Sequence, residues 1–366
     1  MRRSQKSQFD YHSYRGRTTL TDWLKRIALI LALLVLAAVA ALFVLQPFTS
    51  YTDGGLQWDL PFFSRQEPES SASGNYTIVE GDPNAQPDAS QEEPAPPAAP
   101  ETASSLLSVP LSALLDGSAA QLAREAGADG VTVTVKDDAG ALAWQSEQPL
   151  AAQAMEGVPE DSASALTQWN QGDVYTAARL SCFRDEALGS SMDYTLRTSS
   201  DYRWQDGEGA HWTTPSNPAV QEYLIGLMTE LAQMGFDEIV LEHWGYPTQA
   251  DGSLSNLKTG EDNYPAGALA PVISHFLAQA AQALEPYGTK LSLAGEADVL
   301  AGNGAEPCLT ADAVNAHVDR LWVPGDRSQV LSVLEAAGVE NAGERTVSLA
   351  EALDPSSQEP QAVWNE

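Results

Sequence analysis

The stretch NPAVQEYLIGLMTELAQMGFDEIVLEH, residues 217–243, decides the fold. Asn217 is a good N-cap and Pro218 a good first helical residue, and apolar side chains then recur at helical spacing until a glycine ends the pattern. The continuous apolar run at 239–241 that follows is typical of a strand covered on both faces. The stretch therefore predicts a helix followed at once by a buried parallel strand, with Glu242 where that strand ends.

Outside this stretch, the same alternation of strands and helices continues. Apolar runs predict seven further strands, near residues 106–109, 131–135, 174–183, 290–294, 318–323, 345–349 and 362–364. Helical patterns separate several of them, near residues 118–126, 271–284 and 328–337. Alternating elements are typical of a parallel sheet built from βα units, and about 250 residues is the usual length of a (β/α)8 barrel. We therefore predict an α/β fold with a (β/α)8 TIM-like barrel over residues 105–366. An open doubly wound sheet is the alternative, but no G-x-G-x-x-G follows the first strand.

The N-terminal region contains an uncharged apolar run of nineteen residues at 27–45, which at 1.5 Å per residue covers roughly 28 Å, about one hydrocarbon core. Seven basic and two acidic residues precede it, whereas the next basic residue after it is Arg65. The positive-inside rule then predicts a cytoplasmic basic tail at 1–26, one transmembrane signal-anchor helix at 27–46 and an extracytoplasmic remainder. A cleaved signal peptide is the alternative, but the run exceeds the usual h-region of roughly 7–15 residues, and no small-x-small site follows it before Pro47.

The region between this helix and the predicted barrel, residues 47–104, is rich in Pro, Ser, Glu, Ala and Gln. This composition predicts a disordered, extended stalk. The net charge of the chain is −31, and since the basic tail carries +5, about −36 falls on the rest. A polyanion of that size repels phosphate backbones, so we expect no nucleic acid partner.

Cysteine and histidine usage argues against a metal or other cofactor. Cys182 and Cys308 are the only cysteines, too few for a disulfide scaffold or a cysteine-based zinc site. One bridge between them stays open, although Cys182 lies in a predicted strand, where a buried free thiol is the commoner case. The five histidines show no H-x-x-x-H or H-E-x-x-H pattern, and no G-x-S-x-G indicates a nucleophilic serine.

The reactive side chains of such a barrel stand at the carboxyl ends of the strands, because the loops there vary while the rest of each strand is packed core. Charged side chains converge on this predicted rim: Lys136, Asp137, Asp138, Arg179, Arg184, Asp185, Glu242, His243, Glu296, Asp298, Asp326 and Arg327. Cleavage of a glycosidic bond requires two carboxyl groups, one to protonate the leaving oxygen and one to act as nucleophile or as base for water. We predict Glu242, Glu296 and Asp137 as the candidate catalytic carboxylates.

The other rim residues are candidates for substrate binding, each with a plainer alternative. The predicted binding residues are Arg179, Asp185, Trp244, Tyr246, Asp298 and Asp326. A strand arginine needs a carboxylate partner, so an ion pair of Arg179 with Glu242 or Asp185 is as well supported as a substrate clamp. Aromatic rings at a barrel mouth bind sugar faces but are also ordinary packing. Asp138 is expected to serve as a turn residue, and His243 to be packed or solvent-exposed, because adjacent strand residues point to opposite sides.

The stretch before Glu242 also resembles a known family. GFDEI at 235–239 and the residues after it are similar to the Q-F-D-Y-I-R-F-P pattern of the putative glycoside hydrolase domain family, which occurs in exported bacterial proteins and lies near the α-amylase-like hydrolases. The resemblance covers roughly residues 106–366, with supporting matches at 133–140, 178–185, 212–223 and 364–365. It implies a TIM barrel that hydrolyses glycosidic bonds, with Glu242 and Asp137 at matching positions.

The sequence departs from the family pattern at three polar positions, so it resembles a divergent member. Glu242 stands where the family usually has Asp, Thr134 where it has Asp, and Gly245 where it has Arg. Glu carries its carboxylate roughly 1.5 Å further out than Asp, and a displacement near 1 Å can cost about a hundredfold in rate. Two hypotheses follow. The first is a membrane-anchored extracytoplasmic glycoside hydrolase that acts on a cell-surface or environmental polysaccharide. The second is a catalytically inactive barrel that binds cell-wall glycan or a protein partner.

Overall fold

The chain forms two compact units, residues 1–90 and 91–366. The computed structural model describes residues 49–52, 55–58, 102–304 and 307–364. In the first unit, β1 (Thr49–Thr52) and β2 (Gly55–Trp58) pair as an antiparallel hairpin. This hairpin was not predicted, and it falls within the interval predicted as a stalk.

The predicted basic tail at 1–26 and the predicted transmembrane helix at 27–46 lie outside the described residues. Most of the predicted stalk at 47–104 lies outside them as well. Within the part of the chain that the structure describes, no helix is both long and apolar enough to cross a membrane. The membrane anchor therefore stays a prediction from the sequence.

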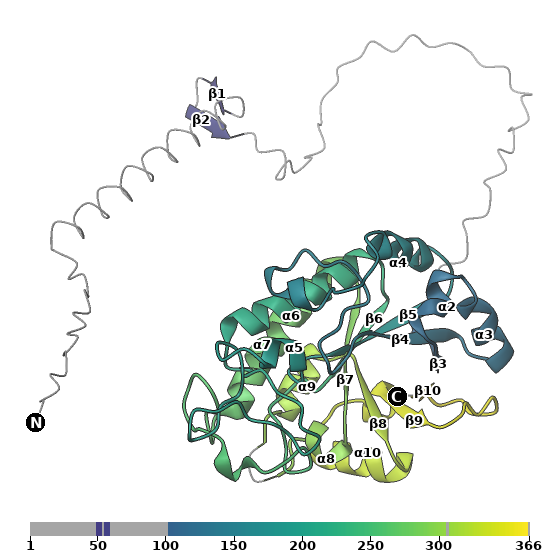
Figure 1. Cartoon of the computed structure of the whole chain (residues 1–366). Coiled ribbons are helices and arrows are strands. Elements are labelled where there is room, and N and C mark those ends of the chain that lie inside the picture. Colours follow the sequence, from purple (N-terminus) through teal and green to yellow (C-terminus); the bar gives the residue numbers. More distant parts are fainter. Residues whose placement is uncertain (1–48, 53–54, 59–101, 305–306, 365–366) are drawn as a thin grey trace, which may run out of the picture. The chain divides into compact units, whose positions relative to one another are not determined.

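The second unit is a closed barrel of eight parallel strands (Figure 1). The order of the strands around the barrel is β10-β3-β4-β5-β6-β7-β8-β9. Their bounds are β3 (Ser105–Ser108), β4 (Gly130–Lys136), β5 (Tyr175–Ser181), β6 (Glu238–Glu242), β7 (Lys290–Ala294), β8 (Arg320–Pro324), β9 (Thr346–Ala350) and β10 (Gln361–Val363). All eight predicted strands are confirmed, and closure of the barrel excludes the open doubly wound alternative.

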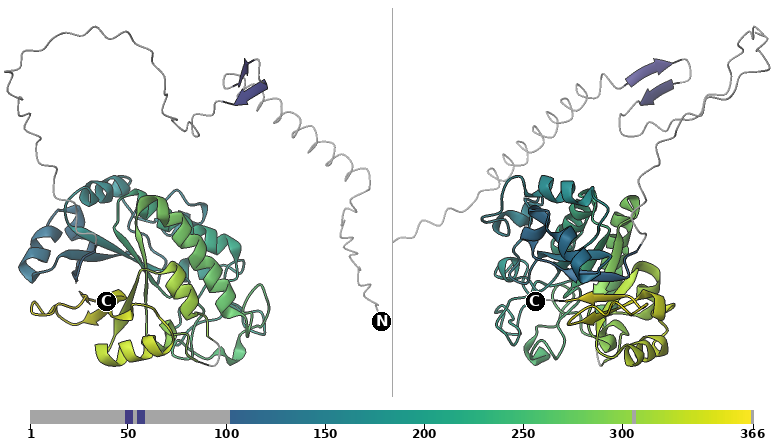
Figure 2. Two further views of the ribbon diagram at one scale, coloured as in Figure 1. Left: turned by 180° about the vertical axis from the view of Figure 1, so that it is seen from behind. Right: turned by 90° about the vertical axis from the view of Figure 1, so that its right-hand side faces the viewer.

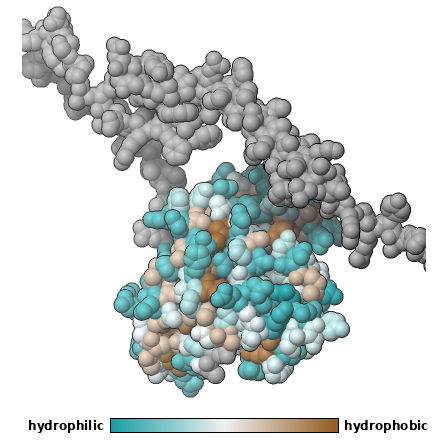
Figure 3. Space-filling model, turned by 90° about the vertical axis from the view of Figure 1, so that its left-hand side faces the viewer, coloured by the Kyte–Doolittle hydropathy of each residue, from teal (hydrophilic) through white to brown (hydrophobic). Residues whose placement is uncertain are grey.

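The helices lie outside the strands (Figure 2). They are α2 (Leu111–Leu115), α3 (Ala119–Ala126), α4 (Ser162–Asn170), α5 (Glu186–Gly189), α6 (Pro218–Gln233), α7 (Leu269–Leu284), α8 (Ala297–Leu300), α9 (Ala311–His317), α10 (Arg327–Ala336) and α11 (Ala342–Arg345), with 3-10 turns η2 (Pro149–Gln153), η3 (Leu254–Asn256) and η4 (Glu285–Tyr287). The predicted cap of α6 is present, since the Asn217 side chain accepts a hydrogen bond from the Ala219 N–H at 2.9 Å. The predicted α3, α6, α7 and α10 are confirmed to within two residues at each end. The face of this unit shown in Figure 3 is mainly hydrophilic, with small separate apolar spots, as its acidic composition leads one to expect.

Strand β6 shows how the barrel separates two cores. Ile239 and Leu241 belong to the large core that includes buried side chains of α6 and α7, whereas Val240 belongs to a smaller core with Trp322 and other inward-facing side chains. Because successive side chains of a strand point to opposite faces, Glu238 and Glu242 share the inner face with Val240. The periodicity of β6 thus directs Glu242 into the mouth of the barrel.

The inner face also carries a fully buried carboxylate, that of Glu238. Its Oε2 accepts from the Tyr175 hydroxyl at 3.0 Å and from Arg320 Nη1 at 3.0 Å. Its Oε1 accepts from the Ser292 hydroxyl at 2.5 Å and from Trp322 Nε1 at 2.8 Å. A buried carboxylate is tolerated only when it is paired and hydrogen-bonded, and here donors on β5, β7 and β8 supply both.

Candidate functional site

Two adjoining cavities open at the carboxyl ends of the barrel strands, where the sequence predicted the site. The larger has a volume of about 660 Å³ and the smaller about 330 Å³. Both are lined by Glu242, His243, Ala250, Asp251 and Trp364. The larger is completed mainly by charged side chains, which include Asp137, Asp138, Arg179, Arg184, Asp206 and Glu208. The smaller is completed mainly by Trp212, Trp244, Tyr246, Glu296 and Val299.

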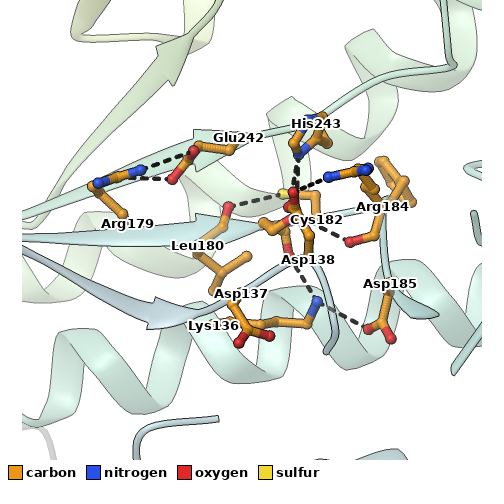
Figure 4. A network of polar contacts seen from close by, with 12 residues as sticks. Lys136, Asp137, Asp138, Arg179, Leu180, Cys182, Arg184, Asp185, Glu242 and His243 are labelled. Atoms are coloured by element: carbon orange, nitrogen blue, oxygen red, sulfur yellow. Dashed lines mark hydrogen bonds and ion pairs between the residues drawn. The ribbon is translucent and has the colours of Figure 1, made fainter. Parts of the chain in front are cut away.

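Glu242, the last residue of β6, is held by Arg179 of the neighbouring strand β5 (Figure 4). Arg179 Nε lies 2.9 Å from Glu242 Oε1, and Arg179 Nη2 lies 3.2 Å from Oε2. The guanidinium carbon also lies 3.5 Å from the centroid of the Trp364 ring. A bidentate pair stacked on an indole fixes the orientation of the carboxylate. The predicted Arg179–Glu242 ion pair is therefore present.

Asp138 is a centre of polar contacts at the turn after β4 (Figure 4). It accepts from the Ser181 hydroxyl at 2.6 Å, is paired with Arg184, and lies 3.1 Å from His243 Nδ1. Burial alone would raise the pKa of Asp138, but the hydrogen bond and charge of His243, together with Ser181 and Arg184, outweigh it and lower the pKa well below its usual value. Asp138 does lie in a turn, but our prediction that it serves only the turn was wrong, because its carboxylate lines the larger cavity.

His243 lines the same two cavities as Glu242, contrary to our expectation. The expectation rested on strand alternation, but β6 ends at Glu242 and His243 has φ +47°, in the left-handed region. This change of backbone direction sets aside the alternation and lets consecutive side chains enter one cavity. A non-glycine residue in this region is uncommon, and such conformations concentrate at functional sites.

Arg184, in the loop after β5, lines the larger cavity. Arg184 Nε lies 2.8 Å from Asp206 Oδ2, and its Nη2 lies 2.5 Å from Glu208 Oε2. Asp185, predicted to bind substrate, is buried and caps α5 by accepting from the Leu188 N–H at 2.8 Å. Its other oxygen lies 2.9 Å from the fully buried Lys136 ammonium. Asp185 is not among the residues that line the two cavities, so its contacts hold the loop in place.

The other two predicted catalytic carboxylates lie in different cavities. Asp137 lines the larger one, and its Oδ1 accepts from the Ala141 N–H at 2.9 Å. Glu296 is exposed and lines the smaller one, at the start of α8. The structure therefore places both predicted partners along cavities that Glu242 also lines.

Of the remaining predicted binding residues, two lie in the wall of the smaller cavity and two lie at the starts of helices. Trp244 and Tyr246 are buried in the wall of the smaller cavity, where Trp244 Nε1 donates to the Ala294 carbonyl at 3.0 Å. Asp326 caps α10 by accepting from the Gln329 N–H at 3.1 Å. Asp298 accepts from Asn303 Nδ2 at 2.9 Å. Neither aspartate lines either of the two cavities.

Several residues of the site were not predicted as such. Ser181, Asp206, Glu208 and Asp251 line the larger cavity, yet no spacing in the sequence connects them to the strand ends that they face. Trp364 was predicted as the end of the last strand and as part of a family match but not as a site residue, and its stacking on Arg179 depends on barrel closure. Both cysteines are free and buried. Among the described residues, no group of three or more His, Cys, Asp or Glu side chains is placed to hold a metal ion.

Comparison with known families agrees with this architecture. Residues 112–303, more than half of the chain, match the family described as "Putative glycosyl hydrolase domain". The chain belongs to this family. The resemblance noted from the residues around Glu242 is thereby confirmed, and the fold that the family implied, a TIM barrel, is the one observed.

Solved structures similar to this member of the family include the following three. A hypothetical protein from Ruminiclostridium thermocellum is 22% identical, with a TM-score of 0.42, covering 51% of this chain and 96% of that one. A GH20 exo-β-N-acetylglucosaminidase from Vibrio harveyi is 11% identical, with a TM-score of 0.42, covering 67% and 40%. The glycoside hydrolase domain of PelA from Pseudomonas aeruginosa is 12% identical, with a TM-score of 0.39, covering 68% and 84%. No curated protein matches the sequence.

Proposed function

We propose that this protein is a membrane-anchored, extracytoplasmic glycoside hydrolase that acts on a cell-surface or environmental polysaccharide. Membership of the glycosyl hydrolase-like family supports the reaction class. The observation that carries the proposal is the Glu242 carboxylate, which lies at the end of β6 in the wall shared by two cavities. Arg179 holds this carboxylate by both oxygens.

Glu242 has the geometry of the anionic member of a hydrolytic pair. The Arg179 guanidinium orients the carboxylate, and a carboxylate in this position can attack an anomeric carbon or stabilise the positive charge that develops there. The second group must deliver a proton to the leaving oxygen. Candidates for it line the cavities on both sides of Glu242, with Asp137 in one and Glu296 in the other.

The location and the substrate class rest on the sequence together with the shape of the site. The apolar run at 27–45 with its basic flank supports an anchor that leaves the barrel outside the cytoplasm. A barrel held there would meet cell-surface and environmental polysaccharides, which are the substrate class that we propose. Two adjoining cavities, with volumes of about 660 and 330 Å³, offer room on both sides of Glu242, as cleavage within a chain requires.

The test uses the purified full chain and its Glu242→Gln variant on a panel of polysaccharides. We expect wild type to release reducing sugar, and the variant to retain less than about one hundredth of that rate, because Gln cannot act as nucleophile or stabilise cationic charge as a carboxylate does. Glu222→Gln, an exposed position on α6, serves as the control and should match wild type. Circular dichroism checks that both variants keep the fold. Equal rates for wild type and Glu242→Gln would contradict the role of Glu242.

A non-catalytic barrel that binds cell-wall glycan or a protein partner is the second candidate function. One observation favours it, since both oxygens of Glu242 are engaged by Arg179 at 2.9 and 3.2 Å. A carboxylate held in this way is a weaker nucleophile. Saturable binding of a glycan from the same panel with no sugar release would support this candidate, and hydrolysis by wild type would eliminate it.

A further inference from the structure

The ring of His243 forms polar contacts through one nitrogen only, among the residues that the structure describes. Its Nδ1 lies 3.1 Å from Asp138 Oδ1 and 3.2 Å from the Ser181 hydroxyl. The ring meets Trp212 edge to face, with centroids 5.4 Å apart and planes at 79°. Among the residues that the structure describes, none forms a hydrogen bond with Nε2, and the side chain is 29% exposed. One nitrogen is thus held while the other is left for a ligand.

The partner at Nδ1 determines which proton the ring holds. Asp138 stays ionised, since Arg184 and Ser181 also bind its carboxylate. An ionised carboxylate accepts a proton but cannot donate one, so Nδ1 carries the hydrogen of this contact. The second ring nitrogen, Nε2, is then the position that gains and loses a proton. This is the arrangement by which a carboxylate orients a histidine for proton transfer.

Three acidic groups that line a cavity with His243 are already engaged. Glu242 is bound through both oxygens by Arg179, and Asp251 Oδ2 accepts from the Thr248 N–H at 2.6 Å and from its hydroxyl at 2.8 Å. Asp206 is paired with Arg184. Asp137 and Glu296 are the rivals, since Asp137 is exposed in the larger cavity and Glu296 in the smaller one. His243, however, lines both cavities directly beside Glu242.

We propose that His243, oriented by Asp138, is the acid and base of the hydrolytic site and takes the part that a second carboxyl group plays in most glycoside hydrolases. This inference rests on the proposed function. In the first step, the bond between the anomeric carbon and the leaving oxygen breaks, and the proton on Nε2 passes to that oxygen. Glu242 stabilises the positive charge or bonds to the anomeric carbon. In the second step, neutral Nε2 takes a proton from water, whose hydroxyl bonds to the anomeric carbon and releases Glu242.

The test compares leaving groups, because a general acid matters only where the leaving oxygen needs a proton. His243→Gln in the full chain should lower the rate on the polysaccharide by about 10²–10⁴-fold. On the 2,4-dinitrophenyl glycoside of the sugar released, whose phenolate leaves unprotonated, we expect the first-turnover release of dinitrophenolate to stay within about threefold of wild type. A merely structural role would lower both rates alike.

Three further variants make the outcome decisive. His211→Gln is the matched control, since His211 Nδ1 contacts Glu186 at 2.9 Å but does not line either cavity, and it should leave both rates unchanged. Asp137→Asn and Glu296→Gln test the rival groups. A leaving-group-dependent loss in either of these variants instead of His243→Gln, or equal losses on both substrates in His243→Gln, would overturn the inference. Wild type that cleaves neither substrate would instead refute the proposed function, and the inference with it.

Discussion

Glu242 and His243 are neighbours in the sequence, yet only one was predicted in the site. Glu242 follows from two independent signals, the periodicity of β6 and the family pattern. His243 was misplaced because strand alternation was extended one residue too far. A glycine at this position would have indicated a positive φ, whereas a histidine does not. The φ of +47° that brings His243 into the cavity could therefore not be predicted from the residue type. The alternation of side-chain directions therefore applies only to residues within the regular strand.

The contacts of Asp138 predict how stability depends on pH. Its pKa is lower in the folded state than the ordinary value of about 3.9, so ionised Asp138 contributes stability that is fully present above that value. The contribution is lost as the pH falls toward the lower folded-state pKa. We therefore expect Asp138→Asn to be less stable than wild type at pH 6, with a clearly smaller difference at pH 3. Urea unfolding at both pH values measures this.

The matched control for this prediction is Asp173→Asn, at an exposed position outside both cavities. It should follow wild type at pH 6 and at pH 3. A difference between Asp138→Asn and wild type that stays constant from pH 6 to pH 3 would mean that the ionised carboxylate is not the source of the stability.

At the scale of elements, pattern length explains why the shortest helices were missed, although α4, with nine residues, was missed as well. The four helices predicted by periodicity have between eight and sixteen residues, whereas α5, α8 and α11 have four each. One turn cannot show a repeat of 3.6 residues, so helices of this length leave no periodic signal. The eight strands were found because continuous apolar runs mark strands that are covered on both faces.

Glu238 joins four strands of the barrel, since β6 carries it and β5, β7 and β8 supply its donors. Nothing in the apolar pattern predicted an acidic side chain that is 0% exposed. Replacing Glu238 by Gln keeps the shape but leaves the buried Arg320 guanidinium without its counter-charge. We expect this variant to lose about 3–5 kcal/mol of unfolding free energy, as when one partner of a buried ion pair is removed.

The measurement is the denaturant midpoint of the full chain, with Glu222→Gln on the exposed face of α6 as the control. A midpoint for Glu238→Gln equal to that of wild type would show that Arg320 finds compensation elsewhere. Because Glu238 lies below the cavities and does not line them, activity per folded molecule should be kept.

At the scale of the whole molecule, the sequence predicted a closed barrel correctly but not the contacts that its closure creates. Length and alternation indicate a barrel, whereas the stacking of Arg179 on Trp364 exists only because β10 returns to lie between β9 and β3. The same closure gives Trp364 a place in the wall of both cavities. Contacts between residues far apart in the chain depend on the order of the strands around the barrel. The apolar pattern of an individual strand does not encode that order.

The anchor proposed for residues 27–46 determines where this barrel works and can be tested on the whole chain. In a bacterial host, we expect the full chain to sediment with the membrane fraction and to resist extraction with 1 M salt, at which the Debye length of about 3 Å screens surface charge. Deleting residues 1–46 should move the protein to the soluble fraction and leave its activity on sugar unchanged, because the cavity residues that the structure describes belong to the barrel. A variant with Leu33 and Leu36 both changed to Arg should fail to insert, since each charge at the centre of the span costs about 2.5–3.5 kcal/mol. Full-length protein found in the soluble fraction would contradict the anchor while leaving the hydrolytic site untouched.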